Sequence, residues 1–400
     1  MSSRKFNVLI LLGFLFTIFN SCLPVHVDAQ VSDPDYWPTA GWLVATPESQ
    51  GLDSTWYRQM ENYISGWESS ATLRSILIVR HGYLVYENYF QVQSRINQTR
   101  NIFSCTKSVT SALIGIAISQ GYLSLNDYMV DFFSHLTIDN LDARKEAVTV
   151  EDLLTMTSGL PWDESSYPYT HPNNDWYRMT TSPDWVQFVI DRPMEYNPGE
   201  QWVYNTGGSH LLSAIVAQAT NMTTLNFAET ALFTPLGITD YSWQHSPNGI
   251  ECGGSGLQLR PRDMAKFGFL YLHRGSWDGT VILPSSWVTA SSSQKVTLSA
   301  NTGYGYQWWI RPNMEAYAAH GYENQHIFVI PNHDMIVVIT AASNDLEIFS
   351  LIENYVLPSA TIPADSSGLG LAIGFIITAG LISVIVVILL KFKPFKSNNA

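Results

Sequence analysis

The chain has 400 residues, of which 46% are hydrophobic and 13% aromatic, and its formal net charge is −13. This length fits one large domain or two interleaved domains, and the aromatic content argues against a disordered chain. The acidic balance argues against binding to nucleic acid and against a role on anionic lipid, because both of these partners are negatively charged.

The N-terminal end, residues 1–29, has the pattern of a secretory signal peptide. Arg4 and Lys5 precede a mostly apolar run, and small residues stand before Gln30. This arrangement is typical of a cleaved leader, and an uncleaved N-terminal anchor is the alternative. We therefore expect the folded domain to cover residues 30–357.

The C-terminal end has the pattern of a membrane anchor. Residues 369–390 contain no charge and are long enough to cross a hydrocarbon core of about 30 Å. Three lysines follow at once, so the positive-inside rule predicts a cytoplasmic tail at 391–400. With a short linker at 358–368, these patterns predict a single-pass protein of the cell membrane whose catalytic domain is extracytoplasmic.

The elements between the two ends follow from periodicity and turn signals. Strands are predicted at 75–80, 83–89, 304–310, 326–330 and 335–340. Helices are predicted at 53–67, 104–120, 152–158, 211–220, 224–233, 261–273 and 346–356. The stretch 160–200 is aromatic but lacks periodicity, so we expect a loop there.

This order of elements predicts the fold class. Strands and helices come from both ends of the chain, and the middle is mostly helical. We expect an α/β (α+β) fold, with an antiparallel sheet flanked by helices, a helical insertion at about 108–250 and the C-terminal transmembrane helix. A cleft where the sheet and the insertion meet is the default place for a site.

The first candidate site residues are Ser104 and Lys107, at the start of the predicted helix 104–120. Residues three apart share one face of a helix, so the hydroxyl and the amine can meet. A desolvated lysine can lose its proton and activate a serine as a nucleophile. A capped helix with a surface lysine is the simpler interpretation. Against it, Lys107 lies in an apolar run with no acidic residue at helical spacing.

Two further segments carry candidate chemistry. Tyr204 lies in a turn before a helix, and its phenol could move a proton if a nearby cation lowered its pKa. Gly321 stands just before the strand 326–330, where a backbone N–H could complete an oxyanion hole with that of Ser104. Taken alone, the first would be an ordinary half-buried tyrosine and the second a hairpin turn.

Other chemistries find little support in the sequence. The ten histidines show no metal-ligand spacing, and we expect no metal. There is no phosphate-binding P-loop and no G-x-S-x-G motif. After removal of a leader, Cys105 and Cys252 remain, either as a disulfide or as two buried thiols.

Several motifs in order give the chain a family resemblance. They are Arg80-His-Gly-Tyr-Leu-Val-Tyr-Glu, Ser104-x-x-Lys107, Leu153-Leu-Thr-x-Thr-Ser-Gly-Leu-Pro161, Pro198-Gly to Tyr204, the glycine-rich segment from Gly254 to Gly268, and Tyr304-Gly-Tyr-x-Trp-Trp309. The chain resembles the serine β-lactamase-related hydrolases, which include class C β-lactamases, DD-peptidases, esterases and amidases. It looks most like the branch that contains 6-aminohexanoate-dimer hydrolase.

The resemblance implies a fold and a mechanism. It implies the β-lactamase/transpeptidase-like fold, an acyl-enzyme and no cofactor. It also implies Ser104 as the nucleophile, Lys107 as its base and Tyr204 as a proton shuttle.

Two departures from the family pattern affect the expected substrate. Tyr204-Asn205-Thr206 replaces the usual Tyr-x-Asn, so Asn205 or Thr206 would meet the substrate amide. The third motif is Ala319-His320-Gly321, or His320-Gly321-Tyr322 in the other register, and it lacks the lysine that commonly pairs with a substrate carboxylate.

These departures favour an esterase or amidase acting on a small-molecule or short peptide-like substrate of low charge. A β-lactamase or D-Ala-D-Ala carboxypeptidase is one alternative. A catalytically inactive binding protein on the same fold is the other.

Overall fold

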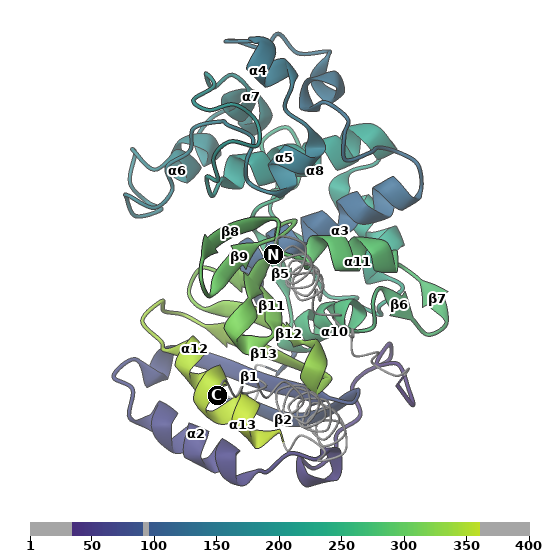
Figure 1. Cartoon of the computed structure of the whole chain (residues 1–400), viewed down its shortest axis with the longest axis vertical. Coiled ribbons are helices and arrows are strands. Elements are labelled where there is room, and N and C mark those ends of the chain that lie inside the picture. Colours follow the sequence, from purple (N-terminus) through teal and green to yellow (C-terminus); the bar gives the residue numbers. More distant parts are fainter. Residues whose placement is uncertain (1–33, 91–95, 361–400) are drawn as a thin grey trace, which may run out of the picture. The chain divides into compact units, whose positions relative to one another are not determined.

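The computed structural model describes residues 34–90 and 96–360 and divides into two compact units. The larger unit covers residues 34–44 and 71–344, and the smaller unit covers residues 45–70 and 345–360 (Figure 1).

An eight-stranded sheet is the framework of the larger unit, and all of its neighbouring strands pair antiparallel. The strand order is β2-β1-β13-β12-β11-β10-β9-β8. Their bounds are β1 Leu73–Arg80, β2 Tyr83–Tyr89, β8 Val296–Ser299, β9 Thr302–Tyr304, β10 Trp309–Arg311, β11 Ala316–Gly321, β12 Gln325–Ile330 and β13 Met335–Ala341. Strand β1 from the start of the chain therefore lies beside β13 from its end, which confirms the predicted sheet.

The long helix α10 (Pro261–Leu272) packs on the central strands of this sheet. Gly268 is the point of closest approach. A Cβ there would lie 2.9 Å from Ile327 Cγ2 and 3.0 Å from Ile336 Cγ2. Only a glycine lets the helix lie this close to the sheet without displacing those side chains.

Most of the remaining helices form the insertion between the two groups of strands (Figure 1). They are α3 Thr106–Ser119, α4 Ala143–Glu146, α5 Val150–Leu154, α6 Asp175–Thr180, α7 Trp185–Ile190, α8 Thr206–Thr220 and α9 Thr224–Ala228, with α11 (Ser285–Ser291) after α10. Shorter 3₁₀ or π turns are Phe103–Cys105, Met129–Phe133, Glu229–Phe233, Pro312–Met314 and Pro331–His333.

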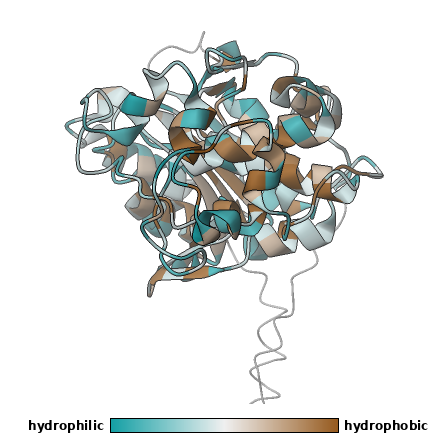
Figure 2. Cartoon of the chain, turned by 90° about the horizontal axis from the view of Figure 1, so that it is seen from above, coloured by the Kyte–Doolittle hydropathy of each residue, from teal (hydrophilic) through white to brown (hydrophobic). Residues whose placement is uncertain are grey.

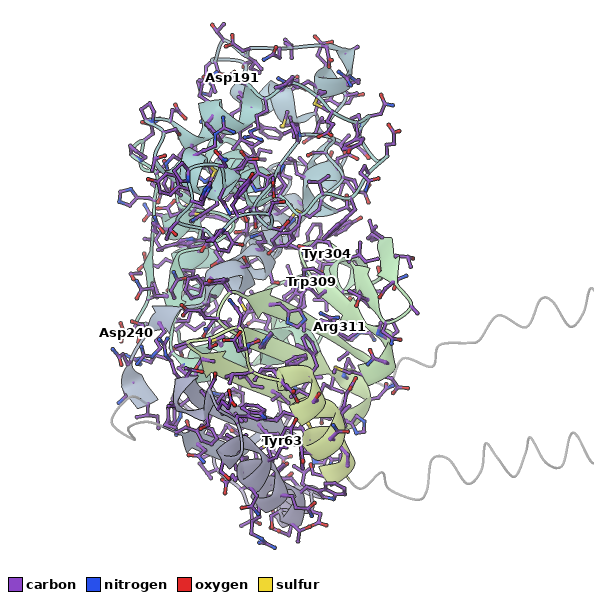
Figure 3. The ribbon with its side chains drawn as sticks, turned by 90° about the vertical axis from the view of Figure 1, so that its left-hand side faces the viewer. Tyr63, Asp191, Asp240, Tyr304, Trp309 and Arg311 are labelled. Carbon is purple, nitrogen blue, oxygen red and sulfur yellow. The ribbon has the colours of Figure 1, made fainter. Side chains whose placement is uncertain are left out.

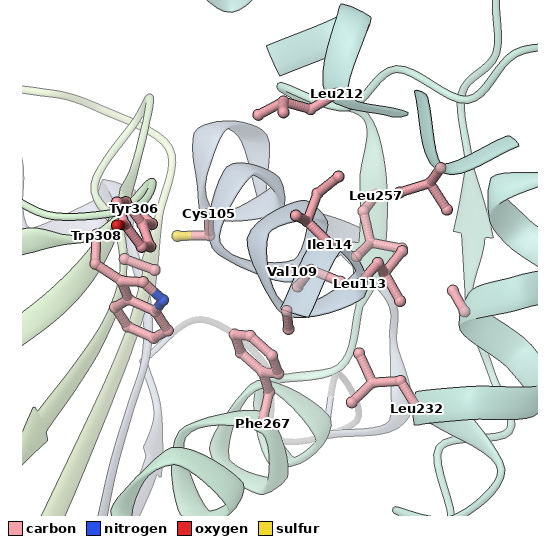
Figure 4. Close-up of a cluster of buried hydrophobic side chains, with 14 of the residues drawn as sticks. Cys105, Val109, Leu113, Ile114, Leu212, Leu232, Leu257, Phe267, Tyr306 and Trp308 are labelled. Carbon is pink, nitrogen blue, oxygen red and sulfur yellow. The ribbon is translucent and has the colours of Figure 1, made fainter. Parts of the chain in front are cut away.

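Helix α3 is the centre of the hydrophobic core. All of its residues from Thr106 to Ala117 are buried. Figure 4 shows Val109, Leu113 and Ile114 of α3 surrounded by apolar side chains from other segments. The buried residues of α3 include the polar Lys107, Ser108 and Thr110, whose side chains are hydrogen-bonded. Brown, apolar ribbon gathers in the inner helices and strands, and teal ribbon in the outer loops (Figure 2).

Two small sheets complete the larger unit. They are β3 Arg100–Asn101, β5 Leu257–Leu259 and β4 Ser242–Trp243 in one, and β6 Ser276–Trp277 with β7 Thr280–Val281 in the other. The smaller unit contains a 3₁₀ turn, the helix α2, the short helices α12 and α13, and a π turn between these two. The bounds are Glu48–Gln50, α2 Thr55–Ser65, α12 Ile348–Leu351, the π turn Ile352–Val356 and α13 Leu357–Ser359.

Two predicted elements differ from the structure. The predicted strand 304–310 is broken into β9 and β10, because Gly305–Trp308 turns back on itself, with Gly305 N donating to Trp308 O at 2.8 Å. The predicted loop 160–200 contains α6 and α7, whose N-caps are Asn174 and Asp184. Each is only six residues long, too short to show a periodic pattern.

The prediction of a C-terminal transmembrane helix is contradicted by the structure. Within residues 34–90 and 96–360, no helix is both long enough and apolar enough to cross a membrane. The predicted span 369–390 itself lies outside the described residues. The fold class is therefore the antiparallel sheet with its helices and helical insertion, without a transmembrane helix in the described residues. The prediction of a single-pass membrane protein depended on that helix and is contradicted with it.

Other predictions on the chain ends are untested. The signal peptide at 1–29 and the tail at 391–400 lie outside the described residues, and the domain boundaries remain predictions. The two alternatives left open for the cysteines are resolved, since Cys105 and Cys252 are both buried and free.

Candidate active site

Ser104 lies in the tight turn that leads into α3. The preceding residue, Phe103, has a positive φ of 46°, and its N–H donates to Asn101 Oδ1 at 2.8 Å. Ile102 N donates to Leu257 O at 2.9 Å, which ties the segment to β5. A non-glycine residue at positive φ is strained, and such strain gathers at functional sites. The turn leaves Ser104 half-buried at the positive end of the α3 dipole.

Lys107 is buried directly beneath Ser104, with a side-chain amine that has three partners. Its Nζ lies 3.0 Å from Ser104 Oγ, 2.8 Å from Thr206 Oγ1 and 2.9 Å from Gly254 O. Only 1% of the residue is exposed. Burial lowers the pKa of this amine, and the Glu164 carboxylate acts in the opposite direction. The neutral amine, which can accept a proton, is therefore favoured relative to a lysine in water.

The Tyr204 ring lies against the Lys107 amine. Lys107 Nζ stands 4.7 Å from the centroid of this ring. The condition set from the sequence, a pKa lowered by a nearby cation, is not met. Burial and the Glu164 charge raise the pKa of the phenol, although a hydrogen bond with Ser104 lowers it. Tyr204 consequently holds its proton at neutral pH and is suited to donate it.

Thr206, which contacts Lys107, is hydrogen-bonded in turn to Glu164. Thr206 Oγ1 donates to Glu164 Oε1 at 2.9 Å, and Thr206 N donates to Glu164 Oε2 at 3.1 Å. The sequence predicts a substrate contact for Thr206 but gives no signal for Glu164. Glu164 lies three residues after the motif that ends at Pro161, and no periodicity marks it. Gly254 was noticed only as part of the family pattern, and its carbonyl contact with Lys107 was not foreseen.

Asn205, the other residue proposed for the second motif, is placed differently. It is buried, and its Oδ1 accepts a hydrogen bond from Gly208 N at 2.8 Å. This contact makes Asn205 the N-cap of α8. Of the pair Asn205 and Thr206, the structure brings only the Thr206 side chain to Lys107.

The third motif meets Ser104 through Gly321, at the end of β11. A Cβ on Gly321 would lie 2.4 Å from Ile102 O and 3.2 Å from Ser104 N. This backbone therefore passes directly beside the start of the nucleophile helix, as only glycine permits. The next residue, Tyr322, is 43% exposed and packs edge-on against Phe103 and Tyr169, with ring centroids 5.7 and 5.1 Å away.

The His320 ring is held by groups other than Ser104. Its Nδ1 lies 2.7 Å from His326 Nδ1, and Arg311 Nε donates to its Nε2 at 3.3 Å. Burial, followed by the neighbouring His326 and the charge of Arg311, holds the pKa of His320 well below its ordinary value. The ring is therefore neutral at pH 7 and supplies no positive charge for a substrate carboxylate.

Aromatic side chains border the site beyond Tyr204. The Tyr204 ring lies 5.9 Å from Trp309 and 6.1 Å from Trp202, and Trp309 lies 5.1 Å from Tyr304. Figure 3 shows Tyr304 and Trp309 side by side, with Arg311 farther along the same strand as Trp309. The border beyond Tyr204 is thus aromatic, with the Arg311 guanidinium 5.7 Å from the centroid of the Trp309 ring.

The family of the chain follows from a match over most of its length. A family profile described as Beta-lactamase matches residues 74–350, which include all the site residues above. The chain belongs to the beta-lactamase family. The family resemblance noted in the sequence is thereby confirmed.

Curated relatives of this beta-lactamase-family chain are distant. Protein flp of Staphylococcus aureus (strain N315) is 26% identical over 194 residues, which are 46% of this chain and 38% of that protein. The chain therefore spans less than two fifths of that relative. An uncharacterized protein of Alkalihalophilus pseudofirmus, BpOF4_21049, is 22% identical over 306 residues, covering 66% of this chain and 82% of that protein.

Solved structures share the fold at low sequence identity. A Bacillus anthracis protein provisionally named a 6-aminohexanoate-dimer hydrolase superposes with a TM-score of 0.66 at 20% identity, covering 84% of this chain and 89% of that one. A D-stereospecific amidohydrolase from Streptomyces sp. has a TM-score of 0.60 at 15% identity, with coverages of 77% and 100%. At these identities the likeness establishes the fold alone.

Proposed function

We propose that this hydrolase cleaves an ester or amide bond of a small-molecule or short peptide-like substrate through an acyl-enzyme on Ser104. The observation that carries the proposal is the 3.0 Å contact between Ser104 Oγ and the buried Lys107 amine. Burial keeps this amine available as a base, so a serine that is a weak nucleophile in water becomes an effective one.

The acylation step uses three residues of the chain. Lys107 takes the proton of Ser104 as Oγ forms a bond to the substrate carbonyl carbon. The backbone N–H groups of Ser104 and of the Gly321–Tyr322 segment are the proposed donors to the oxyanion. Tyr204 gives its proton to the leaving group as the carbon–heteroatom bond breaks, and the Lys107 ammonium returns a proton to the phenolate. In deacylation the neutral Lys107 amine takes a proton from water as the water oxygen bonds to the acyl carbon. The bond to Ser104 Oγ then breaks, the carboxylic acid leaves, and Lys107 returns the proton to Oγ.

Substrates of low charge are favoured by the surroundings of the site. His320 is neutral, and the position before it is Ala319, so neither side chain of the third motif offers a cation. Trp309, Tyr204 and Tyr322 offer apolar contact area instead. Solved structures of the same fold carry the names of a family VIII carboxylesterase and a D-stereospecific amidohydrolase, which supports an ester or amide substrate.

Turnover of β-lactams or of D-Ala-D-Ala peptides is the second candidate. The family description favours it, and the missing lysine at the third motif counts against it. A comparison of a chromogenic cephalosporin with p-nitrophenyl esters separates the two activities, and we expect faster turnover of the esters.

The test of the proposed function is covalent labelling of the full chain with a fluorophosphonate, followed by mass mapping of the adduct. We expect one adduct, on Ser104, which is lost in Ser104→Ala. Ser119→Ala, at the far end of the same helix, is the matched control and should label normally. A folded wild-type protein that forms no adduct would favour the binding-protein alternative, and an adduct that persists in Ser104→Ala would refute the assignment of the nucleophile.

A further inference from the structure

Glu164 is a buried carboxylate that forms no ion pair with any residue in the described part of the chain. Only 6% of the residue is exposed. Its two oxygens accept hydrogen bonds from several donors: Thr206 Oγ1 at 2.9 Å, Thr206 N at 3.1 Å, Trp162 Nε1 at 2.5 Å and the Tyr169 hydroxyl at 3.3 Å. Burial of a charge is costly unless it is well satisfied, so a carboxylate held in this way next to a reactive centre calls for an explanation.

The direction of each hydrogen bond in this chain of groups is determined by chemistry. An ionised carboxylate only accepts, so Thr206 must give its single hydroxyl proton to Glu164. Toward Lys107 Nζ, 2.8 Å away, the Thr206 oxygen can then only accept. Gly254 O, 2.9 Å from the same nitrogen, is a carbonyl and also only accepts.

These constraints orient the amine. Neutral Lys107 has two N–H bonds and one lone pair. Thr206 Oγ1 and Gly254 O take the two N–H bonds. The remaining tetrahedral position is the lone pair, and the third neighbour of the nitrogen is Ser104 Oγ at 3.0 Å. The lone pair therefore faces the proton that it has to remove.

We propose that Glu164 is a positioning residue that, through Thr206, points the lone pair of Lys107 at the Ser104 hydroxyl. This inference rests on the proposed function, because it assigns Lys107 the part of the base. If Glu164 were an amide, the Thr206 hydroxyl could turn and donate to Lys107. In that hydrogen bond the lone pair of Lys107 would point toward Thr206 and away from the Ser104 hydroxyl.

Glu164 also affects the charge of Lys107, and this gives a second, separable signature. The titratable groups that act on the amine are Glu164, Cys105 and Cys252, and the Tyr204 ring lies against it. Burial raises the pKa of both thiols and of the phenol, so all three are neutral at pH 7. Loss of the Glu164 charge should therefore lower the pKa of Lys107 and extend activity to lower pH, while the misdirected lone pair slows the reaction at every pH.

The experiment is the pH dependence of the second-order rate of fluorophosphonate labelling, measured on the full chain. In Glu164→Gln we expect a plateau rate roughly 10- to 100-fold lower, since misorientation of a reacting group can cost up to about 100-fold. We also expect the acid limb at lower pH. The exposed Glu195→Gln is the matched control and should behave as wild type.

Variants of Thr206 keep the inference testable if Glu164→Gln does not fold. Thr206→Val keeps the shape but removes the hydroxyl, and should slow labelling as Glu164→Gln does. Thr206→Ser restores the hydroxyl and should recover most of that loss. A wild-type plateau rate in folded Glu164→Gln, or in Thr206→Val, would overturn the inference. If wild-type protein labels on Ser104 in that case, the proposed function still stands, whereas an unlabelled wild type would refute the proposed function itself.

Discussion

Gly321, at the end of a sheet strand, lies against Ser104, at the start of the central helix. A Cβ on Gly321 would be 3.2 Å from Ser104 N and 2.4 Å from Ile102 O. The nucleophile and the strand end beside it thus come from distant parts of the chain. They lie so close together that one added methyl group does not fit between them. Their separation is therefore sensitive to the smallest possible substitution.

Gly321→Ala should damage the site more than it damages the fold. The added methyl group must push β11 away from Ile102, and we expect labelling of Ser104 to fall by at least about 10-fold, with about 1–3 kcal/mol of stability lost to overpacking. Labelling rates and thermal unfolding measure the two effects. Gly208→Ala is the control, because its Cβ would meet nothing closer than 3.5 Å. Normal labelling by Gly321→Ala would show that this contact does not shape the site.

Lys107→Arg should remove most of the catalysis, although arginine keeps the positive charge of a protonated lysine. A guanidinium stays protonated in proteins and cannot accept the Ser104 proton. We expect labelling to fall by about 10²–10⁴-fold, the usual contribution of a general base. The uncharged Lys107→Met should show a similar loss. If the arginine variant kept most of its activity, Lys107 would act by its charge and not as a base.

The wild-type pH profile should fall on the acid side as Lys107 takes up a proton. Because burial lowers the pKa of this amine, the fall should occur below the pH at which an ordinary lysine titrates. The neutral amine is the active form, so activity is present above this pKa and is lost as the pH decreases through it. Initial rates with a p-nitrophenyl ester across the pH range measure this limb, and a rate that stayed constant down to acidic pH would contradict it.

Tyr204→Phe should discriminate between leaving groups. The variant removes the phenol that we assign to protonate the leaving group, so hydrolysis of an alkyl amide should fall by about 10²–10⁴-fold. A p-nitrophenyl ester should be affected much less, because p-nitrophenolate leaves without a proton. The ratio of the two rates is the readout. An equal loss on both substrates would instead assign Tyr204 to the activation of Ser104.

Asp334→Asn should stabilise the protein at neutral pH. Burial raises the pKa of Asp334 to about 6, and its Oδ1 is buried with no hydrogen-bond partner among the described residues. Between about pH 4 and 6 the folded state keeps a proton that the unfolded chain has lost, so the free energy of unfolding falls as the pH rises through this window. The cost, about 1–3 kcal/mol, is complete above pH 6.

An asparagine at position 334 removes this cost and tolerates the left-handed backbone, φ 46°. Thermal unfolding at pH 8 and pH 4.5 should show a difference from wild type that shrinks at the lower pH. Asp278→Asn is the control, since Asp278 has a similar φ of 48° but is exposed. A difference of the same size at both pH values would rule out the titration of Asp334 as its cause.

Short-range patterns in the sequence were sufficient for the pairing of Ser104 with Lys107. Their spacing of three residues brings them together on one turn of chain, whatever surrounds it. The mostly apolar run from Val109 to Ala117 is likewise typical of a buried helix. The predicted strands 75–80 and 83–89 leave only His81-Gly82 between them, and both residues have the positive φ of a two-residue hairpin turn.

Tertiary structure alone decided what surrounds that pair. Lys107 meets Thr206 and Gly254 across 99 and 147 residues of chain, and Thr206 meets Glu164 across 42. No periodicity encodes such contacts, because Glu164 and Gly254 lie in loops that only the tertiary fold brings to Thr206 and Lys107. The Asn205 cap of α8 and the contact of His320 with His326 are local, but the burial that keeps His320 neutral is again set by the tertiary fold. Sequence determined which groups carry the chemistry, and packing determined their orientation and charge, because desolvation and hydrogen-bond direction exist only in the folded state.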